Sequence, residues 1–377
     1  MPTPILLLVR ELTAGGSERQ LTEIAKHLDR SRWQPHVGSF HDSGPRAEEL
    51  RQAGVPLVRF PVHSFASLSA LSGARSLGRY LRQHRIQLVH SFDVPMNIFG
   101  VFASRFYRCP AVLSSQRAFR SLVLPRQRRL LRLTDRLVDG VVVNCEALRR
   151  HLAEEENVPA ARIHLCYNGL DLPRFTAPPG ELRPPALRDS SLVIGCACVL
   201  RPEKGLATLL SAFAIVRPLR PGLKLVLLGS GQMRDELVAQ AQQLGISEAV
   251  HFEPATGDVG PWMRAMDIFV LPSLSEALSN SLMEAMFSGC AAVASRVGGN
   301  PELVQDGRTG LTFPPGDAAA LAACLQILIA NDARRHEMAA AGQHLIRDQF
   351  SITSAAQRMG QIYNGILAHQ QNPSRQE

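Results

Sequence analysis

The chain has 377 residues, enough for two domains of ordinary size with separate hydrophobic cores. Hydrophobic residues make up 45% of it and charged residues 20%, and no apolar run reaches the roughly 18 residues of a membrane span, which predicts a soluble or peripheral protein. The chain carries 25 Lys+Arg against 15 Asp+Glu up to Gly180, and 16 against 18 after it, so the basic first half is expected to meet an anionic partner.

The chain opens on an apolar run with no basic segment before it and no small-residue cleavage site. This pattern predicts a first strand rather than a signal peptide, and a cytoplasmic protein. Seven scattered cysteines show no metal-binding spacing, so they are expected to be reduced thiols.

Short apolar runs then alternate with amphipathic segments of helical length. The first series comprises runs at 4–12, 86–92 and 140–145, each followed by such a segment, and a second series begins with runs at 192–199, 224–229 and 268–273. This rhythm is typical of doubly wound parallel sheets. The proline-rich segment 171–190 separates the two series and is interpreted as a linker. We therefore expect two Rossmann-like α/β domains, at 1–175 and 190–350, with ligands bound at the carboxyl ends of their strands.

Two glutamates eight positions apart stand out in SEALSNSLMEAM, residues 275–286. Ser279, Asn280 and Ser281 are good helix-start residues, and the free amides of a helix start form an anion site that suits a diphosphate. Glu276 would lie before this helix start and Glu284 about one turn inside, where carboxylates accept hydroxyl hydrogen bonds from a polyhydroxylated ligand. The alternative is that both are solvated glutamates favoured by the helix dipole.

Residues 267–313, DIFVLPSLSEALSNSLMEAMFSGCAAVASRVGGNPELVQDGRTGLTF, closely resemble the donor-site region of the retaining family-4 glycosyltransferases. Similar segments are TAGGSERQLTEIAKHL near the N-terminus, VVVNCEALRRHL and IHLCYNGLDLPRF before the linker, and LRPEKGLATLLSAF after it. The resemblance covers nearly the whole chain. It implies the GT-B fold, in which two Rossmann-like domains face each other across a cleft, and it makes 351–370 a helix that crosses back to the first domain.

The resemblance also implies roles for the residues of 275–286. Glu276 would contact the hydroxyls of the donor sugar near its reacting carbon, and Glu284 would hold the ribose of the nucleotide. The helix start, capped by Ser279, would receive the donor diphosphate on the amides of Asn280, Ser281 and Leu282.

Other donor-side residues follow from the same resemblance. The loop 227–233, which contains Gly229, and the segment 251–259 would lie beside the nucleotide and its base. Gly15 and Gly16 would face the donor diphosphate or the acceptor. Lys204 in RPEKG would neutralise the donor phosphates as the sugar leaves.

Two positions depart from the family pattern. Val199 stands where the family usually has an arginine, so Arg201, or Arg117 from the first domain, is expected to supply the second cation. VHSFD keeps His90 and Asp93 but replaces the second histidine of the family motif with Phe92, so His90 is either a catalytic residue or a hydrogen-bonding residue at a strand end. No Asp-x-Asp triplet occurs, which predicts transfer without a metal or another cofactor.

The segment 117–136 has seven arginines and one acid, interleaved with leucines. Such a segment is able to lie on an anionic membrane, and the alternative is the solvated face of a buried helix. We expect acceptor or membrane contact here, through six arginines: Arg117, Arg120, Arg126, Arg128, Arg129 and Arg132. Nucleic acid is disfavoured, because Phe119 is the segment's only aromatic residue.

The sequence therefore predicts a retaining, metal-independent hexosyltransferase of polysaccharide or glycolipid biosynthesis, cytoplasmic or peripheral at the cytoplasmic face of the membrane. It would move a hexose-type sugar from a nucleotide diphosphate donor to a glycan or lipid-linked acceptor. Two alternatives stay open, a nucleotide-sugar-binding scaffold impaired at Val199 and Phe92, and a sugar-nucleotide epimerase of the same fold. The sugar, the base, the acceptor and the oligomeric state are not determined by the sequence.

Overall fold

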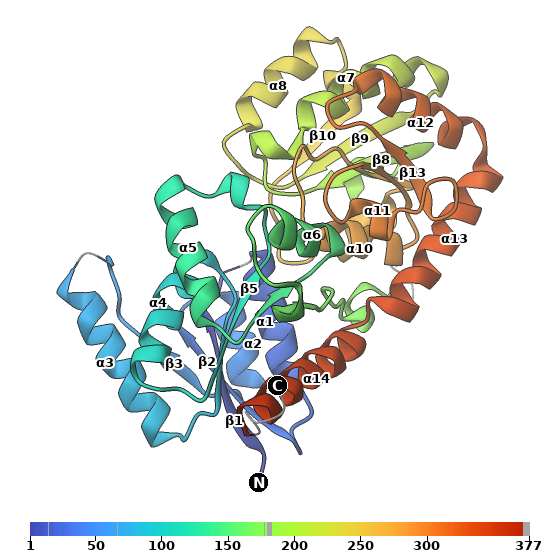
Figure 1. Cartoon of the computed structure of the whole chain (residues 1–377). Helices are drawn as coiled ribbons and strands as arrows, with labels where there is room; N and C mark the ends of the chain where they lie inside the picture. Colours follow the sequence, from blue (N-terminus) through green and yellow to red (C-terminus); the bar gives the residue numbers. More distant parts are fainter. Residues whose placement is uncertain (14, 66, 177, 179–182, 372–377) are drawn as a thin grey trace. The chain divides into compact units, whose positions relative to one another are not determined.

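The structure is a computed structural model that describes residues 1–13, 15–65, 67–176, 178 and 183–371 (Figure 1). The chain divides into two compact units. Unit 1 comprises Met1–Gly169 and Ile352–Glu377, and unit 2 comprises Leu170–Ser351. The first division thus falls at residue 169 rather than at 175. The predicted linker 171–190 includes residues 177 and 179–182, which lie outside the described residues.

Unit 1 is built on a seven-stranded parallel sheet in the order β3-β2-β1-β4-β5-β6-β7. The strands are β1 (Thr3–Val9), β2 (Trp33–Ser39), β3 (Leu57–Arg59), β4 (Leu88–Ser91), β5 (Ala111–Gln116), β6 (Gly140–Val143) and β7 (Ile163–Leu165). Strands β1 and β6 contain continuous apolar runs, Ile5–Val9 and Val141–Val143, as expected of strands that are covered on both faces.

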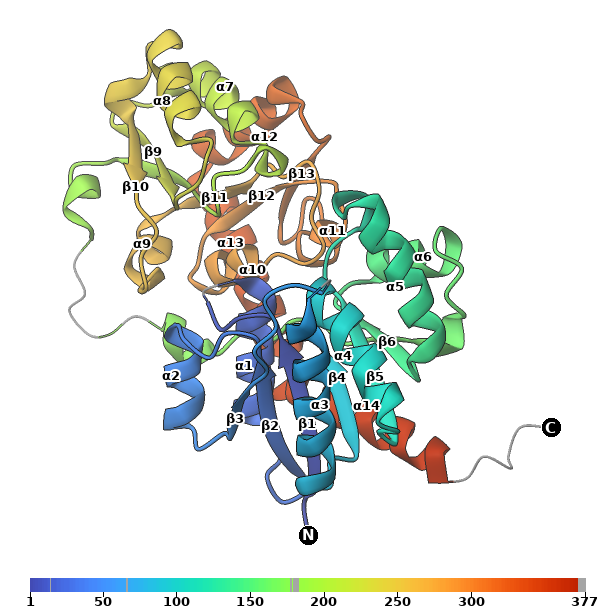
Figure 2. The same cartoon turned by 90° about the vertical axis from the view of Figure 1, so that its left-hand side faces the viewer.

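Helices cover both faces of this sheet (Figure 2). Leu7 of β1 belongs to a core shared with α1 and α14, whereas Leu8 lies against Gly100 of α4 on the opposite face. The helices are α1 (Gly16–His27), α2 (Pro45–Gln52), α3 (Leu68–Gln83), α4 (Val94–Phe106), α5 (Pro125–Leu137), α6 (Glu146–Glu154) and α14 (Ile352–Gln371). The C-terminal helix α14 therefore belongs to unit 1, beside α1.

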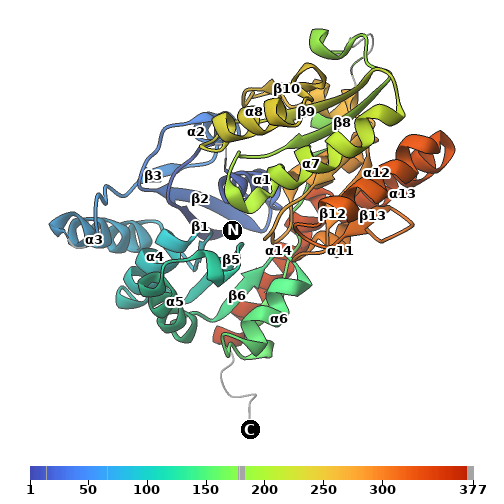
Figure 3. The same ribbon diagram turned by 90° about the horizontal axis from the view of Figure 1, so that it is seen from above.

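Unit 2 repeats the plan with a six-stranded parallel sheet in the order β10-β9-β8-β11-β12-β13 (Figure 3). Its strands are β8 (Leu192–Ala197), β9 (Leu223–Leu228), β10 (Val250–Glu253), β11 (Ile268–Leu271), β12 (Ala291–Ser295) and β13 (Gly310–Phe313). Its helices are α7 (Leu206–Val216), α8 (Arg234–Gln243), α9 (Gly260–Ala265), α10 (Asn280–Phe287), α11 (Asn300–Leu303), α12 (Ala318–Ala330) and α13 (Asp332–Gln349).

Each sheet has one point where the strand order reverses direction. In unit 1 this point lies between β1 and β4, and in unit 2 between β8 and β11. Loops that leave the carboxyl ends of the two strands diverge there, and open α/β sheets bind their ligands at such a point. The loops after β1, β4, β8 and β11 are thus where functional side chains are expected. Among the described residues, no helix is long and apolar enough to cross a membrane.

Candidate active site

An ion pair joins the two loops at the reversal point of unit 2. Lys204, in the loop after β8, donates from Nζ to Oε2 of Glu276, in the loop after β11, over 2.6 Å. Ser273 Oγ donates to the same carboxylate oxygen over 3.3 Å. The two side chains are 22% and 15% exposed, so the pair is accessible to a ligand yet largely shielded from water. The structure thus brings together the two residues expected to act in transfer.

Lys204 stays cationic in this setting. Burial by itself would lower the pKa of the Lys204 ammonium, but the charge of Glu276 and its hydrogen bond outweigh that effect and raise the pKa above its ordinary value. A fixed cation in a shielded site interacts more strongly with charge that develops on a ligand than it would in water.

Two glycines that the sequence interpretation missed hold the loop of Glu276 in place. Gly205 has a φ of +64°, and a Cβ there would lie 2.1 Å from the carbonyl oxygen of Pro272. Gly298 has a φ of +52°, and its Cβ would lie 1.7 Å from the carbonyl oxygen of Glu276. Only glycine fits either position. The signal was present in the sequence as the Gly-Gly pair of VGGN after β12.

Helix α10 begins where predicted, directly after the loop of Glu276. Ser279 caps it, because its Oγ accepts a hydrogen bond from the amide of Leu282 over 3.3 Å, and the Ser279 and Ser281 hydroxyls lie 3.2 Å apart. In this structure the Leu282 amide therefore serves the cap rather than a ligand. Asn280 and Ser281 occupy the first two positions of the helix, where amides have no acceptor within the helix itself.

The remaining predicted donor residues of unit 2 differ in exposure. Glu284 lies in the second turn of α10 and is only 3% exposed. Arg201, expected to replace the cation missing at Val199, has a 61% exposed side chain with Glu203 3.9 Å away. Gly229 follows β9 with a φ of +147°, and its Cβ would lie 1.9 Å from the carbonyl oxygen of Cys198, so it packs the β9 loop onto the β8 loop.

In unit 1 the reversal point carries a carboxylate rather than an ion pair. Gly15 precedes α1, and Gly16 is the first residue of this helix. Asp93, in the loop after β4, accepts hydrogen bonds from the amides of Arg10, over 2.6 Å, and Met96, over 2.9 Å. Asp93 thereby links the loops after β1 and β4 and caps α4.

His90 is not suited to proton transfer with a ligand, because it is buried and both of its ring nitrogens have hydrogen-bond partners. Its side chain is fully buried, with Nδ1 2.8 Å from the Tyr363 hydroxyl and Nε2 2.9 Å from Ser115 Oγ. Burial lowers the pKa of His90 well below its ordinary value, so the ring is neutral. This geometry favours the interpretation as a hydrogen-bonding residue at a strand end that helps to hold α14.

The six arginines expected to form one basic surface do not do so. Arg117 donates to Asn168 Oδ1 over 2.7 Å and lies over the ring of Phe92, and Arg120 is 1% exposed. Arg120 pairs with Asp135 at 2.7 Å and with Glu156 at 3.6 Å.

Glu156 explains most of this difference. Its side chain is fully buried, and Arg128 at 2.7 Å and Arg132 at 2.8 Å pair with it in addition to Arg120. Burial raises the pKa of Glu156, but the three arginines outweigh it and hold the pKa below its ordinary range. The prediction of acceptor or membrane contact is therefore wrong for Arg120, whose side chain is buried. Arg128 and Arg132 are 37% and 50% exposed but are paired with Glu156, because a buried carboxylate requires partners. Arg126 and Arg129 are exposed and have no hydrogen bond or ion pair within the described part of the chain.

No group of three or more His, Cys, Asp or Glu side chains among the described residues is arranged to hold a metal ion. Lys204 pairs with Glu276 of the loop before α10, and Arg201 lies in the same loop as Lys204.

The comparisons with known proteins place both halves of the chain. The model of Glycosyltransferase Family 4 matches residues 14–174, and the model of Glycosyl transferases group 1 matches residues 181–345. Together they cover most of the chain.

Named relatives and solved structures agree with these matches. The lipopolysaccharide core biosynthesis glycosyltransferase LpsE of Rhizobium meliloti is 35% identical over 40% of this chain and 43% of its own length. The GDP-mannose-dependent alpha-(1-6)-phosphatidylinositol monomannoside mannosyltransferase of Mycolicibacterium smegmatis is 27% identical over 84% of this chain and 86% of its own length.

The match to the first curated relatives spans only about half of their length, from 43% to 56%. Anabaena HepE, solved with UDP and glucose, has a TM-score of 0.85 at 23% identity and covers 96% of this chain and 100% of its own, which confirms the predicted GT-B class of fold with two parallel α/β domains. By its two matched halves, the chain belongs to the family-4, group 1 glycosyltransferases, as its motifs predicted.

Proposed function

We propose that this protein is a retaining glycosyltransferase that moves a hexose-type sugar from a nucleotide diphosphate sugar to a glycan or lipid-linked acceptor. The observation that carries this function is the Lys204–Glu276 pair at the reversal point of unit 2, directly before the start of α10. The family membership of the chain supports it independently.

The chemistry follows from where negative charge grows. When the bond between the sugar and the diphosphate breaks, the leaving phosphate gains charge, and Lys204, Arg201 and the positive end of α10 stabilise it. Glu276 accepts hydrogen bonds from sugar hydroxyls and keeps Lys204 oriented, while Glu284 holds the ribose. In a retaining reaction the departing phosphate oxygen takes the acceptor proton on the same face of the sugar, so no strong base is required from His90.

The donor is proposed to be a uridine or guanosine diphosphate sugar. HepE was solved with UDP and glucose, and the mycolicibacterial relative is named as GDP-mannose-dependent. The cation role of Lys204 and Arg201 makes the reaction independent of a metal.

A panel of labelled UDP- and GDP-sugars tests the function, with and without EDTA and with Lys204→Gln as the comparison. Transfer or hydrolysis of one donor by the wild-type chain, retained in EDTA and lost in Lys204→Gln, is the expected result. Binding without turnover would instead support the scaffold, and conversion of one sugar nucleotide into its epimer would support the epimerase.

We further propose that α5 and the turn before it rest on an anionic membrane at its cytoplasmic face, where a lipid-linked acceptor would be reached. Four leucines of this segment are 39–67% exposed: Leu122, Leu124, Leu130 and Leu133. Arg126 and Arg129 stand between them on the helix, as in a helix that lies in a membrane interface.

Vesicle flotation tests this contact. The wild-type chain should float with vesicles that contain phosphatidylglycerol and release at high salt, and Arg126→Gln/Arg129→Gln should float less. Equal recovery of the protein with neutral and anionic vesicles would contradict the proposed contact between α5 and an anionic membrane.

A further inference from the structure

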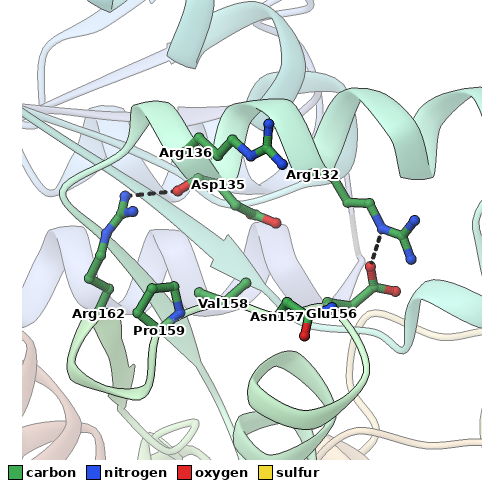
Figure 4. A pocket seen from close by; sticks show the side chains of 8 residues that line it. All are labelled: Arg132, Asp135, Arg136, Glu156, Asn157, Val158, Pro159 and Arg162. Atoms are coloured by element: carbon green, nitrogen blue, oxygen red, sulfur yellow. Dashed lines mark hydrogen bonds and ion pairs between the residues drawn. The ribbon is translucent and has the colours of Figure 1, made fainter.

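A cavity of about 260 Å³ lies in unit 1, away from the edge where the sheet is expected to bind its ligands. Arg132, Asp135 and Arg136 of α5 line one side, and the segment 156–162, between α6 and β7, lines the other (Figure 4). Helix α5 ends just before β6 begins, and 156–162 leads directly into β7. The cavity therefore lies at the amino-terminal edge of the sheet, whereas ligands of such sheets bind at the carboxyl ends.

The carboxylates of this cavity are already neutralised. Glu156 pairs with Arg128 and Arg132, and Arg120 pairs with Asp135 and reaches Glu156. The three arginines Arg120, Arg128 and Arg132 therefore neutralise the two acids Asp135 and Glu156. These two carboxylates leave no net negative charge that would repel an anion.

Two further arginines form no ion pair with an acid in the part of the chain that the structure describes. Arg162 donates from Nη2 to the backbone carbonyls of Asp135, over 2.8 Å, and Val138, which are uncharged acceptors. Arg136 makes no hydrogen bond or ion pair with any described residue and is exposed. Five arginines consequently stand against two carboxylates around one cavity, and the excess charge belongs to residues that line it.

We propose that this cavity binds the phosphate group of a phosphate monoester. Arginine guanidinium groups match the oxygens of a phosphate in charge and geometry, and Arg136 and Arg162 are available to grip it. The cavity is larger than a lone phosphate, so it has room for the group that the phosphate esterifies. The favoured ligand is therefore a small phosphate monoester, either a soluble ester or the phosphate headgroup of a lipid.

The test compares two charge-neutralising variants. Arg136→Gln removes a cation of the cavity, and Arg150→Gln removes an exposed cation of α6 that does not line the cavity and has no hydrogen bond or ion pair with a described residue. Binding of glycerol 3-phosphate is measured by titration calorimetry, and binding of vesicles with phosphatidic acid by flotation. Melting curves show whether both variants stay folded.

Arg136→Gln should weaken binding about tenfold and Arg150→Gln less than about twofold, because only the first loses a charge-assisted hydrogen bond to the phosphate. This difference with glycerol 3-phosphate assigns the site to a soluble ester, and the same difference with phosphatidic acid vesicles alone assigns it to a lipid headgroup. Equal effects of the two variants, or no binding of either probe, would overturn the site. The donor assay with Lys204→Gln is independent of this outcome.

Discussion

At the scale of single residues, we expect Glu276 to contribute mainly to turnover and Glu284 mainly to donor binding. Glu276 orients the cation that faces the leaving group, so Glu276→Gln should lower kcat by roughly 10²–10³-fold with little change in the donor KM. Glu284 is buried within α10, and Glu284→Gln should raise the donor KM about tenfold or more and leave kcat closer to wild type. Initial-rate kinetics measure the split, with the exposed Glu248→Gln as a control. Unchanged kinetics in both variants would remove the site assignment.

Asp93 makes a prediction for pH dependence. Burial raises its pKa to about 6, although the amides of Arg10 and Met96 act in the opposite direction. A carboxyl group with a raised pKa in the folded state contributes stability below its unfolded pKa of about 4, and this contribution is lost as the pH rises through about 6. The stability of the wild type relative to Asp93→Asn should therefore fall between pH 4 and pH 7. Urea unfolding at several pH values measures it, and a difference that grows with pH would contradict the raised pKa.

Glu156 makes a prediction for the stability of unit 1. Glu156→Gln leaves the buried Arg120 with Asp135 as its one carboxylate partner and releases Arg128 and Arg132. We expect a loss of about 2–4 kcal/mol, because breaking a buried pair leaves charge uncompensated. The exposed neighbour Glu154→Gln should change the free energy of unfolding by no more than about 0.5 kcal/mol. Chemical denaturation compares them, and equal effects would show that the arginine cluster is dispensable.

At the scale of elements, the turn at Gly298 fixes the position of the Glu276 loop. Gly298→Ala places a methyl group against the carbonyl of Glu276 and should destabilise unit 2 by about 1–3 kcal/mol and lower transfer markedly. Gly307→Ala is the matched control, since Gly307 also has a positive φ, of 76°, but nothing lies within 4 Å of its Cβ position. Backbone strain alone would affect both variants equally, and only the collision distinguishes Gly298. Transfer by Gly298→Ala at the level of the control would refute the steric role.

Helix α5 shows how an element departs from a sequence interpretation. The sequence shows the arginines of the segment 117–136, but the buried acid that pairs with three of them is Glu156, which lies beyond the next helix. Because these partners are distant in sequence, the pairing could not be predicted from the segment itself. Pro125 is the first residue of α5, a position where the amide hydrogen that proline lacks would have no acceptor within the helix.

For the whole molecule, the alternation of apolar runs and helical segments was sufficient to predict two parallel α/β domains. Strands of parallel sheets are buried on both faces, so they appear in the sequence as short apolar runs. In the sheet of unit 2, β8 lies next to β11, and this pairing places the loops of Lys204 and Glu276 side by side. The spacing of the two residues in the sequence does not show that they are neighbours. They are 72 positions apart, and the sheet brings their loops together. The same limit explains why His90 was kept as a catalytic candidate, because its partners Tyr363 and Ser115 are distant in sequence.

The central claim is that Lys204, held by Glu276, meets the diphosphate of a nucleotide. Calorimetric titration of UDP and GDP into the wild type, Lys204→Gln and the control Lys224→Gln, whose ammonium donates a hydrogen bond to the Glu248 carbonyl, tests it most directly. The expected result is that the wild type and Lys224→Gln bind one nucleotide with equal affinity, whereas Lys204→Gln binds it at least about tenfold more weakly. Equal affinity of all three for both nucleotides, or no binding at all, would contradict the account.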